Sequence, residues 1–176
     1  MEITFRYDYR ESDLAGLPLA ELAEYVLRDE GVGEDACCCV SFVDDAEIAR
    51  LNEEFRGKTG PTDVLSFEAD GYDEDDEFDW PDDPDDAGEL ELGDVVIAPD
   101  VAQAQCAGFG MTFEGELSLL LVHGLLHLCG YDHIEDDDAR EMQARETEIL
   151  AAWAESHPDV APPSYAINAE TVVGEH

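Results

Sequence analysis

The chain has 176 residues, of which 44% are hydrophobic, and a formal net charge of -38. This length suits one domain with a buried core, and five cysteines, three of them consecutive, exclude a paired disulfide framework and favour a reducing cytoplasm. The chain starts without a basic segment followed by an apolar run, and no apolar run reaches the ~20 residues of a membrane span, so we expect neither a secretory signal nor a membrane helix.

Three segments in the first part of the chain have regular patterns. Residues 3–9 alternate apolar and polar side chains, which is typical of a half-buried strand. Residues 19–27 carry apolar side chains at helical spacing and are followed by glycines at 31 and 33. Residues 37–43 favour a buried strand, and we interpret their cysteines as small hydrophobic residues rather than metal ligands.

The next segment predicts a helix and a short strand. The helix is capped by Asp44 or Asp45 and ends near Gly57. Its apolar stripe consists of Ile48, Leu51 and Phe55. A turn rich in Gly and Pro then leads into a strand at 62–67.

Residues 68–91 form the densest acidic segment of the chain. Their charges repel one another, and their apolar content is too low for packing, so we predict a solvated surface insertion. A calcium-binding EF-hand loop is the alternative. Its D-x-D-x-D-G spacing with a glutamate at the twelfth position is absent from this segment.

The rest of the chain predicts a strand and three helices. The strand covers 92–98, and a short helix runs from 99 to about 107. Residues 113–129 are apolar nearly all round, which predicts a buried helix roughly 25 Å long. A last helix begins at the aspartates 136–138, and its core-facing stripe consists of Ala139, Met142, Ile149, Leu150 and Trp153. We expect one domain over 1–155 and a C-terminal tail over 156–176.

Three of the five histidines lie close together near the end of the predicted buried helix. His123 and His127 are four residues apart, so both imidazoles lie on one helix face and can reach one ion. Gly130 is suited to end the helix, and the turn could bring His133 back over it. Three imidazoles and one open position are typical of catalytic zinc, whereas a lone pair is more often packed and hydrogen-bonded.

Two further features bear on the chemistry. The metalloprotease signature places a glutamate directly after the first histidine, and this chain has Gly124 there, which argues against a peptidase. Arg50, Arg56 and Lys58 gather three of the eight cations in one short segment. This grouping favours a phosphate-bearing substrate, because arginine binds phosphate with two parallel hydrogen bonds. Local salt bridges to neighbouring acids are the alternative.

Three motifs resemble those of the YbeY family of bacterial endoribonucleases in rRNA maturation. Residues 123–133 are similar to its H-G-x-L-H-L-x-G-Y-D-H motif. Residues 52–58 with 61–67 resemble a second motif, and residues 92–97 resemble a third. With the order of the elements, the resemblance covers roughly residues 3–155.

The resemblance implies a zincin-like α+β fold with a mixed, mostly four-stranded sheet packed against helices. It also implies one divalent ion, with Zn²⁺ favoured, at the end of the buried helix, although three imidazoles also suit nickel and copper. The implied metal ligands are His123, His127 and His133. Arg56 is implied as the functional arginine, to which we assign phosphate binding and charge stabilisation, and Lys58 could help to position the RNA backbone. Asp132 could orient a ligand imidazole or form the turn.

The implied function is single-strand-specific, metal-dependent endoribonuclease activity in the cytoplasm. The implied substrate is rRNA, including the 3′ end of 16S rRNA, with a role in ribosome quality control and the small ribosomal subunit as a partner. We expect neither DNA nor a membrane as a partner. A zinc-binding ribosome-assembly accessory protein with little nuclease activity is the alternative, and a metallopeptidase is a weaker one.

The acidic composition predicts a requirement for salt. Self-repulsion destabilises a compact state at low ionic strength, and 1 M salt shortens the Debye length to about 3 Å. We therefore hypothesise a halophilic source, with an acidic partner-binding surface as the alternative. RNA would also meet repulsion at this surface at ordinary salt.

Overall fold

A computed structural model describes residues 2–68, 90–109, 112–129 and 136–157. The acidic insertion within 69–89, the segment with Asp132 and His133, and the tail from 158 lie outside the described residues. The elements in chain order are β1 (Glu2–Tyr7), α1 (Glu11–Leu14), α2 (Leu19–Asp29), β2 (Ala36–Phe42), α3 (Asp45–Arg56), β3 (Val64–Glu68), β4 (Leu90–Ile97), α4 (Pro99–Phe109), α5 (Phe113–Leu128) and α6 (Asp136–Ala154).

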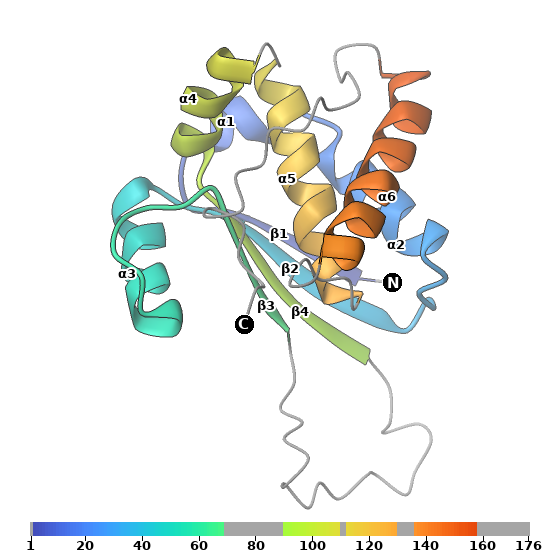
Figure 1. Cartoon of the computed structure of the whole chain (residues 1–176), viewed down its shortest axis with the longest axis horizontal. Helices are drawn as coiled ribbons and strands as arrows, with labels where there is room; N and C mark the ends of the chain where they lie inside the picture. Colours follow the sequence, from blue (N-terminus) through green and yellow to red (C-terminus); the bar gives the residue numbers. More distant parts are fainter. Residues whose placement is uncertain (1, 69–89, 110–111, 130–135, 158–176) are drawn as a thin grey trace, which may run out of the picture.

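The strands form one mixed sheet in the order β1-β2-β4-β3. β1 pairs with β2 and β2 with β4 in parallel, whereas β3 pairs with β4 antiparallel and forms an edge. Figure 1 shows this sheet packed against the helices. The four-stranded mixed sheet and the α+β class are as predicted.

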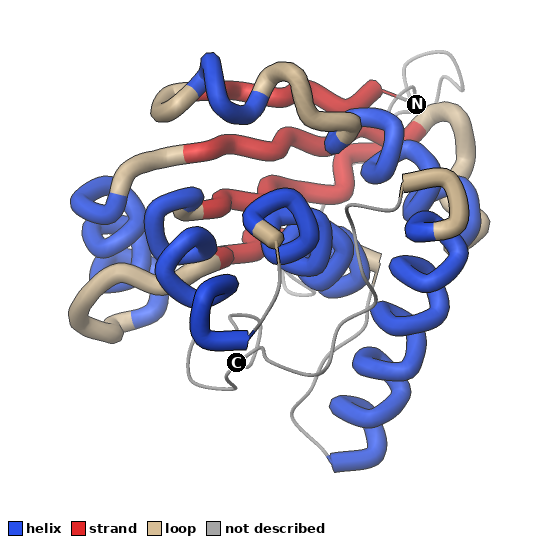
Figure 2. The backbone as a smooth tube through the Cα atoms, turned by 90° about the horizontal axis from the view of Figure 1, so that it is seen from above, coloured by secondary structure: helices blue, strands red, loops and turns tan. Residues whose placement is uncertain are grey.

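The helices divide unequally between the two faces of the sheet. The main core joins α2, α5 and α6 to the inward side chains of the strands, such as Val40, Val95 and Ile97. Figure 2 shows the strands as a layer, with α5 seen nearly end-on against it. A smaller cluster on the opposite face joins Ile48 of α3 to Leu65 and Val96. The sheet therefore packs one face against the main core and the other, in part, against α3.

Four predicted details differ from the structure. Phe55 is 58% exposed and touches Phe67 edge-on, with ring centroids 5.3 Å apart, instead of continuing the buried stripe of α3. The reason is that α3 covers only part of its sheet face. Ala139 of α6 is half-buried. The first strand ends at Tyr7 rather than at residue 9, and the short helix α1 that follows was not predicted.

Two of the few cations hold helices together. Arg145 of α6 forms ion pairs with Asp29 and, at 2.5 Å, with Glu30, both at the end of α2. Arg10 donates to Asp100 of α4 at 3.0 Å. The cysteines are free, and Cys38 lies in the main core as a small hydrophobic residue, as predicted.

Among the described helices, none combines the length and the apolar character needed to cross a membrane.

Candidate metal centre

The helix α5 carries the first two predicted ligands through the middle of the core. Thr112 caps its start by accepting from the Gly115 backbone N–H at 2.9 Å, as capping side chains do. Every residue from 115 to 128 is buried. Because tertiary contacts surround the helix on all sides, its histidines are held in a fixed place relative to the sheet.

The structure brings His123 and His127 together. Their Nε2 atoms lie 3.0 Å apart, and each residue is 3% exposed. Two nitrogens bound to one tetrahedral zinc ion at about 2.0–2.1 Å would lie roughly 3.3 Å apart. The two lone pairs can therefore converge on a single ion after a small adjustment, as the four-residue spacing predicted.

A buried carboxylate lies behind the first of these histidines. Glu146 of α6 is 1% exposed, and its two carboxylate oxygens are 3.1 and 3.2 Å from Nδ1 of His123. A carboxylate at this nitrogen is the usual outer partner of a metal-bound imidazole. Sequence reasoning missed Glu146. The available signal was its place between Met142 and Ile149 on the predicted core stripe, because burial of a charged side chain costs free energy unless it has a partner.

The third predicted ligand, His133, lies outside the described residues. Within the ranges that the structure describes, no three ligand-type side chains converge on one point. The two described imidazoles nevertheless fit a divalent ion, because both are buried, both present Nε2 to the same point, and a carboxylate lies behind one of them. The role of His133 stays a prediction.

Gly124 has a structural reason to be there. A Cβ atom at this position would lie 2.6 Å from Cγ1 of Val95 and 3.3 Å from Oγ of Ser66. The missing side chain lets α5 approach the sheet beside the histidine pair. Because α5 packs so closely on the sheet, there is no room for a glutamate side chain at position 124, where a metalloprotease carries one.

The predicted cations lie on and after α3. Arg56 is the half-buried last residue of that helix, and Lys58 is exposed in the following turn. Two hydrogen bonds of Asn52 stabilise this turn. Its side-chain Nδ2 donates to the Gly60 carbonyl at 3.0 Å, and its backbone carbonyl accepts from the Lys58 N–H. Arg56 and Lys58 thus come from a different element than the histidines, one that packs on the other face of the sheet.

Arg50 forms local salt bridges, which the sequence allows as the alternative to phosphate binding. Its guanidinium contacts Glu47 at 2.6 Å and Glu54 at 2.7 Å. Neighbouring acids on α3 therefore neutralise this arginine, and it is a poor candidate for a phosphate-binding residue.

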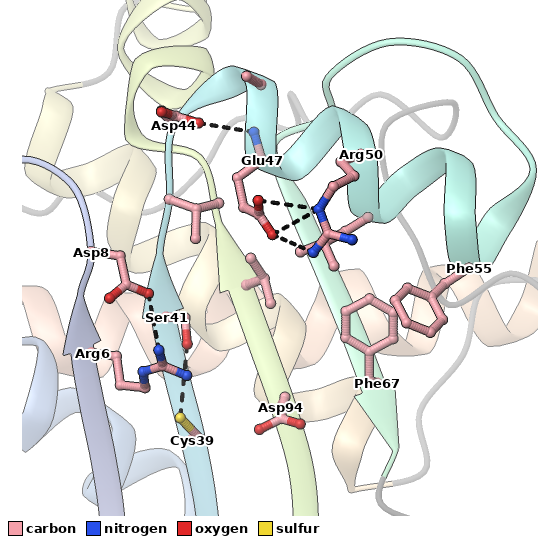
Figure 3. A pocket seen from close by; sticks show the side chains of 14 residues that line it. Arg6, Asp8, Cys39, Ser41, Asp44, Glu47, Arg50, Phe55, Phe67 and Asp94 are labelled. Carbon is pink, nitrogen blue, oxygen red and sulfur yellow. Dashed lines mark hydrogen bonds and ion pairs between the residues drawn. The ribbon is translucent and has the colours of Figure 1, made fainter.

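A cavity of about 980 Å³ lies on the sheet face that α3 covers in part. Figure 3 shows the Arg6–Asp8 and Arg50–Glu47 ion pairs in it, and Phe55 beside Phe67. The lining residues are Arg6, Asp8, Cys39, Ser41, Val43, Asp44, Ala46, Glu47, Arg50, Leu51, Phe55, Phe67, Asp94 and Val96. Neither histidine lines it. Four carboxylates against two paired arginines make it unsuitable for a phosphate.

A second buried carboxylate lies on α5, close to its start. Burial raises the pKa of Glu116 to about 7, and the charge of Asp63 adds to the effect. In the amide orientation that satisfies the hydrogen bonds of Gln105, its side-chain nitrogen donates to Oε1 of Glu116 at 3.2 Å and to Oδ2 of Asp63 at 3.1 Å. This group stands seven residues before His123 and does not touch the histidine pair in the contacts described.

Fold and site together define an α+β protein that carries a candidate metal centre on its central buried helix. The profile of the family described as Endoribonuclease YbeY matches residues 9–154. The chain belongs to the YbeY endoribonuclease family.

Individual relatives agree with this assignment. The chain is 44% identical to the endoribonuclease YbeY of Frankia casuarinae over 81% of its own length and 69% of the relative's. It is 45% identical to that of Acidothermus cellulolyticus, with coverages of 80% and 85%, and 38% identical to that of Macrococcus caseolyticus, with 87% and 96%. The solution structure of a Thermotoga maritima protein has a TM-score of 0.55 and 28% identity, covering 93% of this chain and 99% of that one.

Proposed function

We propose that this protein is a metal-dependent endoribonuclease specific for single-stranded RNA. The proposal extends to rRNA as substrate, with 16S rRNA 3′-end processing, ribosome quality control, the small ribosomal subunit as a partner, and the cytoplasm as the place of action. The observation that supports it most is the buried pair of imidazole nitrogens 3.0 Å apart on α5. The family membership supports RNA as the substrate.

The proposed metal ligands are His123, His127 and His133. When bound, a divalent ion such as Zn²⁺ would supply positive charge at a phosphodiester and lower the pKa of water. Three imidazoles also suit nickel and copper, so metal analysis of the protein is needed to identify the ion.

The chain's own residues would have three tasks. His123 and His127 are buried, so their ring nitrogens are largely shielded from bulk water. Arg56 is proposed to bind the phosphate and to stabilise the charge that develops on it, because a guanidinium can donate two parallel hydrogen bonds to its oxygens. Lys58, exposed in a turn held by Asn52, is proposed to bind a neighbouring phosphate.

The test is cleavage of single-stranded and duplex RNA by the purified full chain, the His127→Ala variant and the Arg56→Ala variant. We expect His127→Ala to abolish cleavage and Arg56→Ala to lower it roughly 10²-fold or more, as loss of one charge-stabilising donor does. Single-stranded RNA should be cut in preference to duplex.

His157→Ala is the matched control. This histidine stacks on Trp153 with ring centroids 3.9 Å apart, away from the pair on α5, so its loss should leave cleavage unchanged. Circular dichroism confirms that each variant is folded. Cleavage that survives both His127→Ala and Arg56→Ala would refute the proposal. So would a result in which only the His157→Ala control loses activity.

A further inference from the structure

Glu146 occupies a position where packing alone would favour an apolar side chain. It lies on the face of α6 that enters the core with Met142, Ile149 and Leu150, and it is 1% exposed. Burial of a carboxylate carries a desolvation penalty of several kcal/mol, and well-packed apolar residues often replace buried ion pairs without loss of stability. The carboxylate therefore calls for an explanation other than stability.

The contact with His123 supplies one. Both oxygens of Glu146 lie within 3.2 Å of Nδ1, on the side of the ring away from His127. A carboxylate in its ionised form only accepts hydrogen bonds, so we assign the donor role in this contact to Nδ1 of His123. The neutral ring then carries its lone pair on Nε2, which is the atom that faces His127.

The tautomer assigned to His123 determines what its Nε2 atom presents to His127. With the His123 proton on Nδ1, the Nε2 lone pair of this ring points toward Nε2 of His127, 3.0 Å away. Ligation through Nε2 would require each neutral imidazole to carry its proton on Nδ1, and the contact with Glu146 already favours that tautomer of His123.

We propose that Glu146 is a positioning residue that fixes the tautomer and the ring orientation of His123 for metal binding. It acts through the imidazole and touches neither RNA nor the metal. The inference rests on the proposed function in one respect, namely that the histidine pair holds a metal. The contact joins α6 to α5 across 23 residues of sequence, so α6 contributes to the centre without supplying a ligand.

The chain offers a matched control in Glu116. This carboxylate is also fully buried, but it lies on α5 beside Asp63 and Gln105. Replacing either glutamate by glutamine removes one buried ionisable group from the same core. Only at position 146 does the change affect the hydrogen bond to a proposed ligand.

The first measurement is the dissociation constant for Zn²⁺, obtained with the full chain by competition against a chromophoric chelator. We expect Glu146→Gln, which keeps an acceptor but loses the charge, to bind zinc roughly 10-fold more weakly, and Glu146→Leu up to roughly 100-fold more weakly. Glu116→Gln should stay within about twofold of the unaltered protein. Equal zinc affinity in Glu146→Leu and the unaltered protein would overturn the inference.

The second measurement needs no variant. Long-range ¹H–¹⁵N NMR of the metal-free protein reports which ring nitrogen of each histidine carries the proton. We expect Nδ1–H for His123, and finding its proton on Nε2 alone overturns the inference. A protein that cuts no RNA, but binds zinc tightly and loses affinity in the Glu146 variants, would refute the proposed function and still support the role of Glu146.

Discussion

The absence of a side chain at Gly124 sets how closely α5 approaches the sheet. An added methyl group would lie 2.6 Å from Cγ1 of Val95, which is shorter than any stable carbon contact. We expect Gly124→Ala to lower the free energy of unfolding by about 1–3 kcal/mol, because either the helix or Val95 must move. Urea denaturation measures this change.

Gly16→Ala is the control for this prediction. A Cβ atom there would have no heavy atom within 4 Å, so the substitution should change the stability little or raise it slightly. Equal effects of the two substitutions would contradict the packing argument.

Glu116 gives a pH dependence whose direction can be worked out. Burial raises its pKa from an ordinary value of 4.5 to about 7, so the folded protein holds this proton to higher pH than the unfolded chain. Its contribution to stability is present in full below pH 4.5 and is lost as the pH rises through about 7.

The check is the difference in free energy of unfolding between Glu116→Gln and the unaltered protein. It should increase in favour of the variant between about pH 5 and about pH 8, because glutamine stays neutral. The other acids titrate in both proteins, so their contributions to the free energy of unfolding cancel in this difference. A difference that does not change with pH would show that the carboxyl has an ordinary pKa in the folded state.

The histidine pair and Glu146 differ in how far the sequence predicts them. Four-residue spacing on an apolar helix is a local pattern, and it is sufficient to place His123 and His127 on one helix face. Glu146 reaches the pair from another helix. Its place on the core stripe of α6 marks it as unusual, but the sequence does not show that this stripe faces His123.

At the scale of elements, Arg145 adds ion pairs to the apolar packing between α6 and α2. The Arg145 side chain is 17% exposed and forms ion pairs with Asp29 and Glu30. Removing the cation would leave the nearly buried Glu30 carboxylate without this arginine partner. We expect Arg145→Ala to lower the free energy of unfolding by roughly 1–2 kcal/mol, more than a typical exposed ion pair contributes.

The same helix supplies the control. Arg140 is 77% exposed and has a single contact of 3.5 Å to Asp137 in the pairs described, so Arg140→Ala should change the free energy of unfolding by less than about 0.5 kcal/mol. Both variants remove one positive charge and can be compared by urea denaturation in the same buffer. A larger effect at Arg140 would contradict the stabilising role assigned to the Arg145 ion pairs.

Apart from the short helix α1, the element types were predictable because each of the other described segments has a clear period or cap. The Asp44 cap of α3 and its end at Gly57, where φ is 67°, follow directly from residue type. The exposed Phe55 was not predictable from periodicity. The stripe shows which helix face is apolar, but only the sheet shows how much of that face is covered.

At the scale of the whole molecule, the net charge of -38 determines how stability depends on salt. We predict that stability rises from low to multimolar salt, since salt screens the repulsion among the acids. Chemical or thermal unfolding at both salt levels measures it. Greater stability at low salt would contradict the halophilic hypothesis.

The same charge predicts an unusual salt dependence of cleavage. Basic nucleic-acid-binding proteins lose affinity as salt rises. Here RNA approaches an acidic surface, and Arg56, Lys58 and a bound ion would have to offset the repulsion locally. Cleavage should therefore improve with salt up to a high optimum. Maximal cleavage at the lowest salt tested would count against this prediction.

The buried histidines of α5 are proposed to hold a metal ion, and the proposed function depends on that ion. Elemental analysis of protein purified without an affinity tag and without added metal tests it most directly, together with the His127→Ala variant prepared in the same way. We predict about one equivalent of a divalent metal, with zinc favoured over nickel or copper, in the unaltered protein and a small fraction of that in the variant. Unaltered protein that contains no metal and takes up none from excess zinc would contradict the metal centre.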